Sequence, residues 1–187
     1  MRFITDRLTI RRFEPDDWRD LHDYLSRPEV VAYEPYDVYS EAQAREESAR
    51  RAEDPAFWAV EARGEARVVG NVWLGENGVE TRELGYVFNS RDWGKGFASE
   101  ACRELVGWAF SEGTRRIVAE CNPLNLASWQ LLERLGFRRE GHLIENVAFR
   151  RDDEGRPVWQ DTYVYALLAS EWMPRHGAML GHAVRAE

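Results

Sequence analysis

Polar and apolar residues alternate over short stretches of the chain, and these stretches define the predicted strands. In the first, apolar Leu8 and Ile10 alternate with polar Thr9 and Arg11, and this two-residue period is typical of a half-buried strand. Other stretches combine alternation with apolar runs that end at turn residues. Together they predict strands at residues 8–13, 57–63, 67–74, 81–88, 115–121, 137–149 and 158–168.

Four further segments carry apolar residues at helical spacing. Leu21 and Leu25 belong to one apolar face that ends before Pro28, and Ser40 begins a capping-box sequence for the next helix. Gly136 follows the last of these segments, where a left-handed glycine commonly ends a helix. The predicted helices span about residues 14–27, 40–51, 97–112 and 126–135.

The resulting order of elements is β-α-α-β-β-β-α-β-α-β-β, without an internal repeat or a linker. This order predicts a single α/β domain over residues 1–174. Residues 175–187 show no sustained pattern, and we expect this C-terminal tail to fray.

Composition narrows the classes of function. The 187 residues include 33 Asp and Glu against 25 Lys and Arg, a net charge of −8, which disfavours nucleic-acid binding and mildly favours cationic substrates such as amines. No apolar run approaches the roughly 20 residues of a membrane span, and the N-terminus lacks a secretory apolar stretch. Cys102 and Cys121 form no metal-binding pattern, so we expect no metal ion, and we expect both to be packed thiols rather than nucleophiles. We expect a cytoplasmic location. Lys95 is the only lysine.

A glycine-rich loop joins a predicted strand to a predicted helix at residues 89–99. Gly94 and Gly96 let the backbone approach a ligand closely, and the first amides of the following helix face an anion. A Walker A loop is excluded because Lys95 is followed by glycine, and the dinucleotide fingerprint is excluded because Ser99 occupies its third glycine position. The loop therefore predicts a pyrophosphate cradle, although a tight turn that needs two glycines explains it equally well.

A second polar cluster follows the next predicted strand. Asn122, Asn125 and Ser128 stand at the carboxyl end of that strand, where ligands gather in open α/β sheets. Asn125 is also in the right place to cap the helix that begins at residue 126. The two roles are compatible.

Three segments in this order carry a resemblance to a known family. They are Leu84-Gly85-Tyr86-Val87, the loop Trp93-Gly94-Lys95-Gly96-Phe97-Ala98, and the run from Asn125 through Ser128 to Glu133-Arg134-Leu135-Gly136-Phe137. The chain resembles the GCN5-related N-acetyltransferases (GNAT), which transfer an acetyl group from acetyl-CoA to an amine. The resemblance covers about residues 5–172 and looks closest to the ribosomal-protein-alanine N-acetyltransferase branch.

The resemblance implies a fold and a cofactor site. The fold is a mixed, mostly antiparallel sheet splayed at a central strand. Gly96 and Ala98 stand in the defining places of the family's loop, whereas Trp93 replaces its usual first residue. The residues implied to bind acetyl-CoA are Val87, Phe88 and Asn89 for the pantetheine, Trp93, Gly94, Lys95, Gly96, Phe97, Ala98 and Ser99 for the pyrophosphate, and also Asn122 and Asn125.

The chemistry requires a base for the amine and a proton for the departing thiolate. Glu83, on the strand that enters the site, is the first candidate for the base, and an ordinary exposed carboxylate paired with Arg82 or another arginine is the alternative. Glu34, Glu120, Glu145 and Asn146 are rivals. Many family members use a tyrosine as the acid, but that position is Leu132 here, so the resemblance points to Ser128. A serine that satisfies only local backbone groups is the alternative for Ser128.

The sequence therefore predicts an acetyl-CoA-dependent N-acetyltransferase that acts by direct attack in a ternary complex. The acceptor is a primary amine, either a protein N-terminus or a small amine, and no nucleic-acid or membrane partner is expected. A monomer and a homodimer both remain open. The alternative function is a non-catalytic acyl-CoA-binding sensor or partner module.

Overall fold

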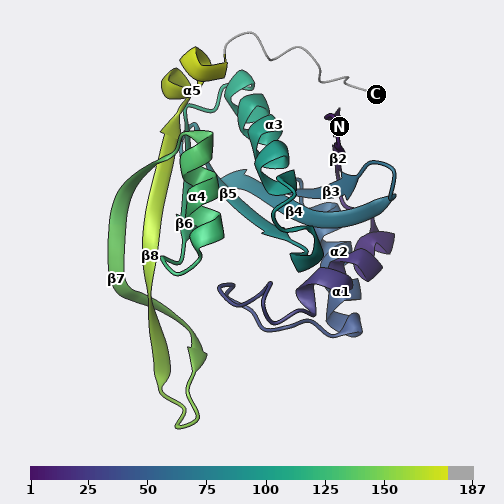
Figure 1. The fold of residues 1–187 in the computed structure, drawn as a ribbon, viewed down its shortest axis with the longest axis vertical. Helices are drawn as coiled ribbons and strands as arrows, with labels where there is room; N and C mark the ends of the chain where they lie inside the picture. The colour runs from purple at the N-terminus through teal and green to yellow at the C-terminus, as the bar shows by residue number, and fades with distance from the viewer. Residues whose placement is uncertain (177–187) are drawn as a thin grey trace.

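A single eight-stranded sheet organises residues 1–176, the part of the chain that the computed structural model describes (Figure 1). Its strands are β1 (Arg2–Ile4), β2 (Leu8–Arg11), β3 (Phe57–Ala62), β4 (Arg67–Glu76), β5 (Thr81–Phe88), β6 (Arg116–Cys121), β7 (Arg138–Arg151) and β8 (Pro157–Leu168). Their order in the sheet is β1-β2-β3-β4-β5-β6-β8-β7. Within the described residues, β5 and β6 form a parallel pair and the other neighbours are antiparallel, which confirms the predicted α/β class.

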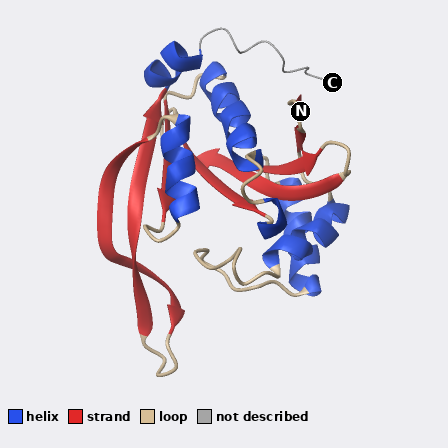
Figure 2. Ribbon diagram, in the orientation of Figure 1, coloured by secondary structure: helices blue, strands red, loops and turns tan. Residues whose placement is uncertain are grey.

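Helices cover both faces of this sheet (Figure 2). They are α1 (Trp18–Leu25), α2 (Glu41–Glu53), α3 (Phe97–Ser111), α4 (Leu126–Leu135) and α5 (Ala169–His176), with short 3-10 turns at Pro15–Asp17 and Ser90–Asp92. The capping box at Ser40 and the left-handed cap at Gly136 form as predicted. In the described part of the chain, no helix combines the length and the apolar character needed to cross a bilayer.

The sheet is split between β5 and β6. The two strands pair only where Thr81–Glu83 meets Arg116–Val118, so residues 84–88 of β5 have no partner in β6. Figure 1 shows the two strands running apart from this point. The predicted splay at a central strand is therefore present, and its open end faces the loop that leads to α3.

Two cores hold the layers together. The larger one packs α3 and α4 against the sheet, with Leu105 and Leu132 fully buried beside Leu84 and Phe88 of β5. The smaller one packs α1 and the loop after it against β3 and β4, and Val87 of β5 contacts this second core. Successive residues of β5 thus point into opposite layers, as the two-residue period of a strand requires.

Two elements were not predicted. The three residues of β1 are too short for a periodic signal, and β1 forms because Phe3 is buried and pairs with Ile10 of β2. The helix α5 contains Pro174, which disfavours a helix, but Trp172 packs its ring 6.0 Å from that of Phe110. Both elements thus depend on tertiary contacts. The remaining residues of the predicted tail, 177–187, lie outside the described residues.

Candidate active site

The backbone of β5 presents one set of amides to β4 and the other to the split. The N–H of Asn89 donates to Val69 O at 2.9 Å, so this amide is occupied within the fold. Since N–H directions alternate along a strand, the amide of Val87 also faces β4 and that of Phe88 faces away from it. Of the three amides predicted to hold pantetheine, the structure leaves Phe88 directed to the split. The amides of Val87 and Asn89 face β4 because successive N–H groups of a strand alternate in direction, and a contact of these two residues with acetyl-CoA stays a prediction.

The glycine loop opens directly into α3. Gly94 and Gly96 have φ angles of 77° and 81°, in the left-handed region that favours glycine. The first helical hydrogen bond runs from Glu100 N to Gly96 O, so the amides of Phe97, Ala98 and Ser99 precede it and have no acceptor within the helix. A Cβ atom at Gly94 would meet nothing within 4 Å, so the loop is open on that side. The loop therefore fits an anionic group such as a pyrophosphate.

Lys95 and Trp93 use their side chains to hold this loop. The Lys95 ammonium lies 2.7 Å from Asp92, whose side chain is fully buried and also binds Arg67 at 3.0 Å. Burial alone would raise the pKa of Asp92, but the hydrogen bonds from Arg67 and Lys95 outweigh burial and lower that pKa. The indole of Trp93 donates to Phe88 O at 2.9 Å. The one lysine of the chain thus anchors the predicted cradle.

Replacing Asp92 by asparagine is expected to destabilise the protein by about 2 kcal/mol at neutral pH, since hydrogen bonds to charged groups are lost. Because the pKa of Asp92 is lowered by folding, its contribution is present above the unfolded pKa and disappears as pH falls through the folded one. Urea unfolding of both proteins at neutral and acidic pH measures this. Glu65→Gln is the control, because it removes only an exposed partner of Arg67. If Asp92→Asn lowered the free energy of unfolding as much in acid as at neutral pH, the charged role assigned to Asp92 would be wrong.

An ion pair that the sequence analysis missed clamps the other side of the loop. Arg7 binds Glu100 of α3 at 2.6 Å and donates through Nη1 to Lys95 O at 2.7 Å. Arg7 precedes the first predicted strand and Glu100 lies 93 residues further on in a predicted helix, so no local pattern indicates their contact. The pair fixes the first turn of α3 relative to the glycine loop.

The polar side chains before α4 mostly make hydrogen bonds within the fold. Asn125 caps α4 by accepting from Ser128 N at 3.2 Å, as the sequence analysis allowed. The Asn122 amide donates to Gln160 of β8 at 2.8 Å, and its oxygen accepts from Leu124 N at 2.8 Å. The direct role in acetyl-CoA binding that the resemblance implied for Asn122 and Asn125 stays a prediction.

Ser128 lies in the first turn of α4, beside β5. Its Oγ is 3.0 Å from the hydroxyl of Tyr86, a residue that was read only as part of a strand motif. Leu132, at the position where many family members carry a tyrosine, is fully buried in the core. Burial raises the pKa of Cys121 to about 11, so this neighbour of Ser128 is a neutral thiol, and Cys102 is fully buried.

Glu83 lies on the opposite face of the sheet from Ser128. Leu84 and Phe88 of β5 point toward α3 and α4, so Glu83 points toward the layer of α1 and α2. Its carboxylate accepts from Asn77 at 3.1 Å, whereas Arg82 binds Thr114 and Leu74 O. Arg82 therefore does not pair with Glu83, because neighbouring strand residues point to opposite faces. Burial, and then the charge of Glu120, raise the pKa of Glu83.

The rival bases occupy different positions. Glu120 is exposed on the same face as Glu83 and acts on it through its charge. Glu34 lies in the loop after α1, where burial raises its pKa although the Tyr36 hydroxyl lowers it in part. Glu145 and Asn146 are exposed on β7, away from the paired part of β5 and β6.

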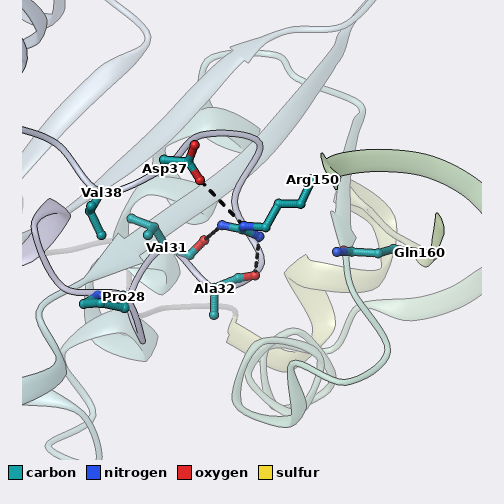
Figure 3. A pocket seen from close by; sticks show the side chains of 7 residues that line it. All are labelled: Pro28, Val31, Ala32, Asp37, Val38, Arg150 and Gln160. Carbon is teal, nitrogen blue, oxygen red and sulfur yellow. Dashed lines mark hydrogen bonds and ion pairs between the residues drawn. The ribbon is translucent and has the colours of Figure 1, made fainter. Parts of the chain in front are cut away.

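A pocket of about 530 Å³ lies between the loop after α1 and the β7–β8 hairpin (Figure 3). Its lining residues are Pro28, Val31, Ala32, Asp37, Val38, Arg150 and Gln160. The Arg150 guanidinium donates to Val31 O and Ala32 O, each at 2.8 Å, and lies 3.7 Å from Asp37. Arg150 thus ties the loop to β7, and the Asp37 carboxylate stays 90% exposed at the rim. Among the described residues, no cluster of His, Cys, Asp or Glu is arranged to hold a metal ion.

Comparisons with known proteins agree with this geometry. Residues 7–138 match the acetyltransferase (GNAT) domain family. The uncharacterized N-acetyltransferase YnaD of Bacillus subtilis is 34% identical over 178 residues, which cover 92% of this chain and 99% of the relative. A GNAT-family acetyltransferase from Bacillus anthracis has a solved structure with a TM-score of 0.84 and 34% identity, covering 91% of this chain and 100% of that one.

Two more distant structures share the fold alone. A spermidine N-acetyltransferase from Vibrio cholerae, solved with CoA and spermine, has a TM-score of 0.75 at 24% identity and covers 90% of this chain and 99% of its own. A ribosomal-protein-S5-alanine acetyltransferase from Vibrio fischeri has a TM-score of 0.76 at 19% identity, with coverages of 92% and 98%. The family match over residues 7–138 and the relative at 34% identity define the class as an acyltransferase of a family that uses acetyl-CoA. The chain belongs to the GNAT family and is an N-acetyltransferase, which transfers an acetyl group to an amine.

Proposed function

We propose that this chain transfers the acetyl group directly from acetyl-CoA to a primary amine while both are bound. The observation that carries the proposal is the split between β5 and β6, with Glu83 on one face of the sheet and Ser128 on the other. A gap through the sheet lets a donor and an acceptor approach the same point from opposite faces. No residue of the chain then has to carry the acetyl group itself.

The donor side is built from backbone amides. The amides of Phe97, Ala98 and Ser99 bind the pyrophosphate at the positive end of the α3 dipole, within the loop that starts at Trp93. The amide of Phe88 lies along the pantetheine and donates to the thioester carbonyl as negative charge develops there. Bound acetyl-CoA supplies the activated acetyl group as a thioester. Main-chain donors of this kind are preorganised because β5 and α3 hold them in place.

The acceptor side carries the base. An amine attacks only when it has lost its extra proton, and Glu83 accepts that proton directly or through a water. Burial and the nearby Glu120 raise the pKa of Glu83, which makes it a stronger base than an exposed glutamate. The two carboxylates together also attract a cationic amine to this face.

The acceptor pocket is the one between the loop after α1 and the β7–β8 hairpin. Gln160 lies on the same side of β8 as Val164, which pairs with Glu120, so the pocket opens onto the face that carries Glu83. Asp37 offers an exposed carboxylate to a second ammonium group. A small polyamine carries such a second ammonium group, whereas a protein N-terminus supplies the reacting amine alone. The names of the two distant structures include spermidine and an alanine of a ribosomal protein.

Calorimetric titration with acetyl-CoA, with ATP as the control nucleotide, is the first test. Micromolar binding of acetyl-CoA alone, about 8 kcal/mol, is expected. Release of CoA thiol is then measured with spermidine, an aminoglycoside and peptides that begin with alanine. Turnover with one of these amines identifies the acceptor class. Tight acetyl-CoA binding without turnover on any amine would instead favour the non-catalytic binding module, and equal binding of ATP would remove the donor assignment.

A further inference from the structure

The hydroxyl of Tyr86 makes two contacts with one residue. It lies 3.0 Å from Ser128 Oγ and 3.0 Å from Ser128 O. Tyr86 belongs to the part of β5 that has left β6, and its ring packs against the core beneath α3 and α4. The contact therefore bridges the split strand and the first turn of α4, directly beside the proposed path of the thioester.

The phenol has a single proton to share between these two acceptors. Burial raises the pKa of Tyr86 well above its ordinary value, so the group stays protonated throughout the working range. When the phenol donates to Ser128 O, the Ser128 hydroxyl turns back toward Tyr86. When it donates to Ser128 Oγ, the proton of Ser128 is free to point to a third group.

The side chain of Cys121 also hydrogen-bonds with Ser128. Cys102 of α3, Cys121 of β6 and Arg134 of α4 are close enough to act electrostatically on the pKa of Tyr86. Burial raises the pKa of both thiols, Cys121 to about 11, so neither carries charge at neutral pH. Leu132 fills the place of the tyrosine that many family members use and points into the core. Ser128 thus has two side-chain partners here, the Tyr86 hydroxyl at 3.0 Å and the neutral Cys121 thiol, and of these the phenol is the stronger hydrogen-bond donor.

We propose that Tyr86 is a positioning residue, whose hydroxyl donates to Ser128 Oγ and directs the Ser128 proton to the sulfur that leaves the acetyl group. The inference rests on the proposed function. The bond between the amine nitrogen and the acetyl carbon forms, the carbon–sulfur bond breaks, and its electron pair stays on sulfur as a thiolate. Ser128 stabilises that thiolate by a hydrogen bond, and the thiolate takes its proton from solvent. The ammonium gives one proton to Glu83 before it attacks, and the nitrogen gives up a second as the amide forms. Both pass to solvent by way of Glu83, so no proton leaves Tyr86.

Kinetics of three variants test this assignment. Tyr86→Phe keeps the ring and is expected to lower kcat about tenfold, the effect of one hydrogen bond to a charged group, with the KM for acetyl-CoA unchanged. Ser128→Ala lowers kcat at least as much but does not abolish it. In the double variant, Tyr86→Phe adds nothing, because no serine remains to be positioned. Tyr165→Phe is the matched control, since it also removes a buried tyrosine hydroxyl bond, to Glu133 at 3.0 Å.

Binding of CoA itself gives a readout that needs no turnover. A hydroxyl directed at sulfur favours the thiolate, so the wild-type affinity for CoA should rise between about pH 6.5 and about pH 9. Calorimetry is expected to show this rise about tenfold smaller in Tyr86→Phe and in Ser128→Ala. The S-ethyl thioether of CoA cannot ionise and serves as the control ligand, for which the three proteins should show the same pH profile.

Several outcomes would overturn the inference. A wild-type kcat in Tyr86→Phe, or an equal loss from Tyr86→Phe with and without Ser128, would show that Tyr86 does not act through Ser128. If Tyr86→Phe does not fold, Ser128→Ala still tests the inference. An unchanged kcat and an unchanged pH profile of CoA binding in Ser128→Ala would show that Ser128 has no role in which Tyr86 could position it. If the wild-type protein acetylated no amine at all, the proposed function would fail together with this inference. A loss of the inference alone leaves wild-type turnover intact, so the two failures are distinguishable.

Discussion

Glu83→Gln is expected to lower kcat for amine acetylation by about 100-fold near pH 6.5, the usual scale of a lost general base. Glutamine keeps the size of the side chain and can still accept from Asn77, but it cannot take a proton from the amine. The deficit should shrink as pH rises, because a growing fraction of the amine is then already neutral. Rates measured across pH at saturating acetyl-CoA give this ratio directly.

Two further measurements separate catalysis from structure in this variant. The Kd for acetyl-CoA should not change, because Glu83 lies on the face opposite the α3 layer. Since folding raises the pKa of Glu83, its ionisation costs stability between the unfolded and folded pKa values, and this cost persists at neutral pH. Glu83→Gln should therefore be as thermally stable as the wild type, or slightly more so.

Glu120→Gln is the matched control for the base assignment. It removes the neighbouring charge that raises the pKa of Glu83, so the acid limb of the pH–rate profile should move to lower pH while kcat at its plateau is retained. A flat ratio between the wild type and Glu83→Gln at every pH would transfer the base role elsewhere. Glu34, whose pKa burial also raises, would then be the next residue to replace.

Gly96→Val is expected to weaken acetyl-CoA binding by about 100-fold, because strain of about 1–3 kcal/mol is added where the pyrophosphate lies. The φ angle of Gly96 is 81°, which a β-branched residue adopts only at high cost. A Cβ there also comes within 3.4 Å of Arg7 Nη2, the side chain that clamps the loop to Glu100. Either the loop changes shape or the new side chain intrudes into the cradle.

The same helix offers a control at its other end. Gly113 has a φ of 94° and a Cβ added there would meet nothing within 4 Å, so Gly113→Val adds comparable strain far from the cradle. Calorimetric titration of both variants with acetyl-CoA measures the difference. An unchanged Kd in Gly96→Val, or equal losses in the two variants, would show that the glycine loop does not hold the pyrophosphate.

Local patterns were sufficient for most of the elements and for the loop. The capping sequence at Ser40, the cap residue Asn125 and the glycines at positions 94, 96 and 136 act through their own backbone neighbours, and each adopts the predicted conformation or cap. Hydrophobic periodicity reflects burial on one face, so it located the strands and helices to within a few residues. These features need no knowledge of distant contacts.

Contacts between distant segments decided the rest of the candidate site. The choice of Phe88 among three amides follows from which neighbour β5 pairs with, and the pairing of Glu83 with Asn77 follows from the register of β4 and β5. The bond between Tyr86 and Ser128 joins residues 42 positions apart. Sequence spacing carries no information about such distances.

The sequence by itself determined the α/β class, the glycine loop ahead of α3 and the family that this loop indicates, because these depend on local backbone preference and on periodic burial. The tertiary structure alone decided β1 and α5, the clamp from Arg7 to Glu100, the ion pair of Arg67 with buried Asp92, and the two faces on which Glu83 and Ser128 stand. Each of these requires side chains from different elements to meet. Their energies come from burial and charge pairing, which exist only once the sheet has brought those elements together.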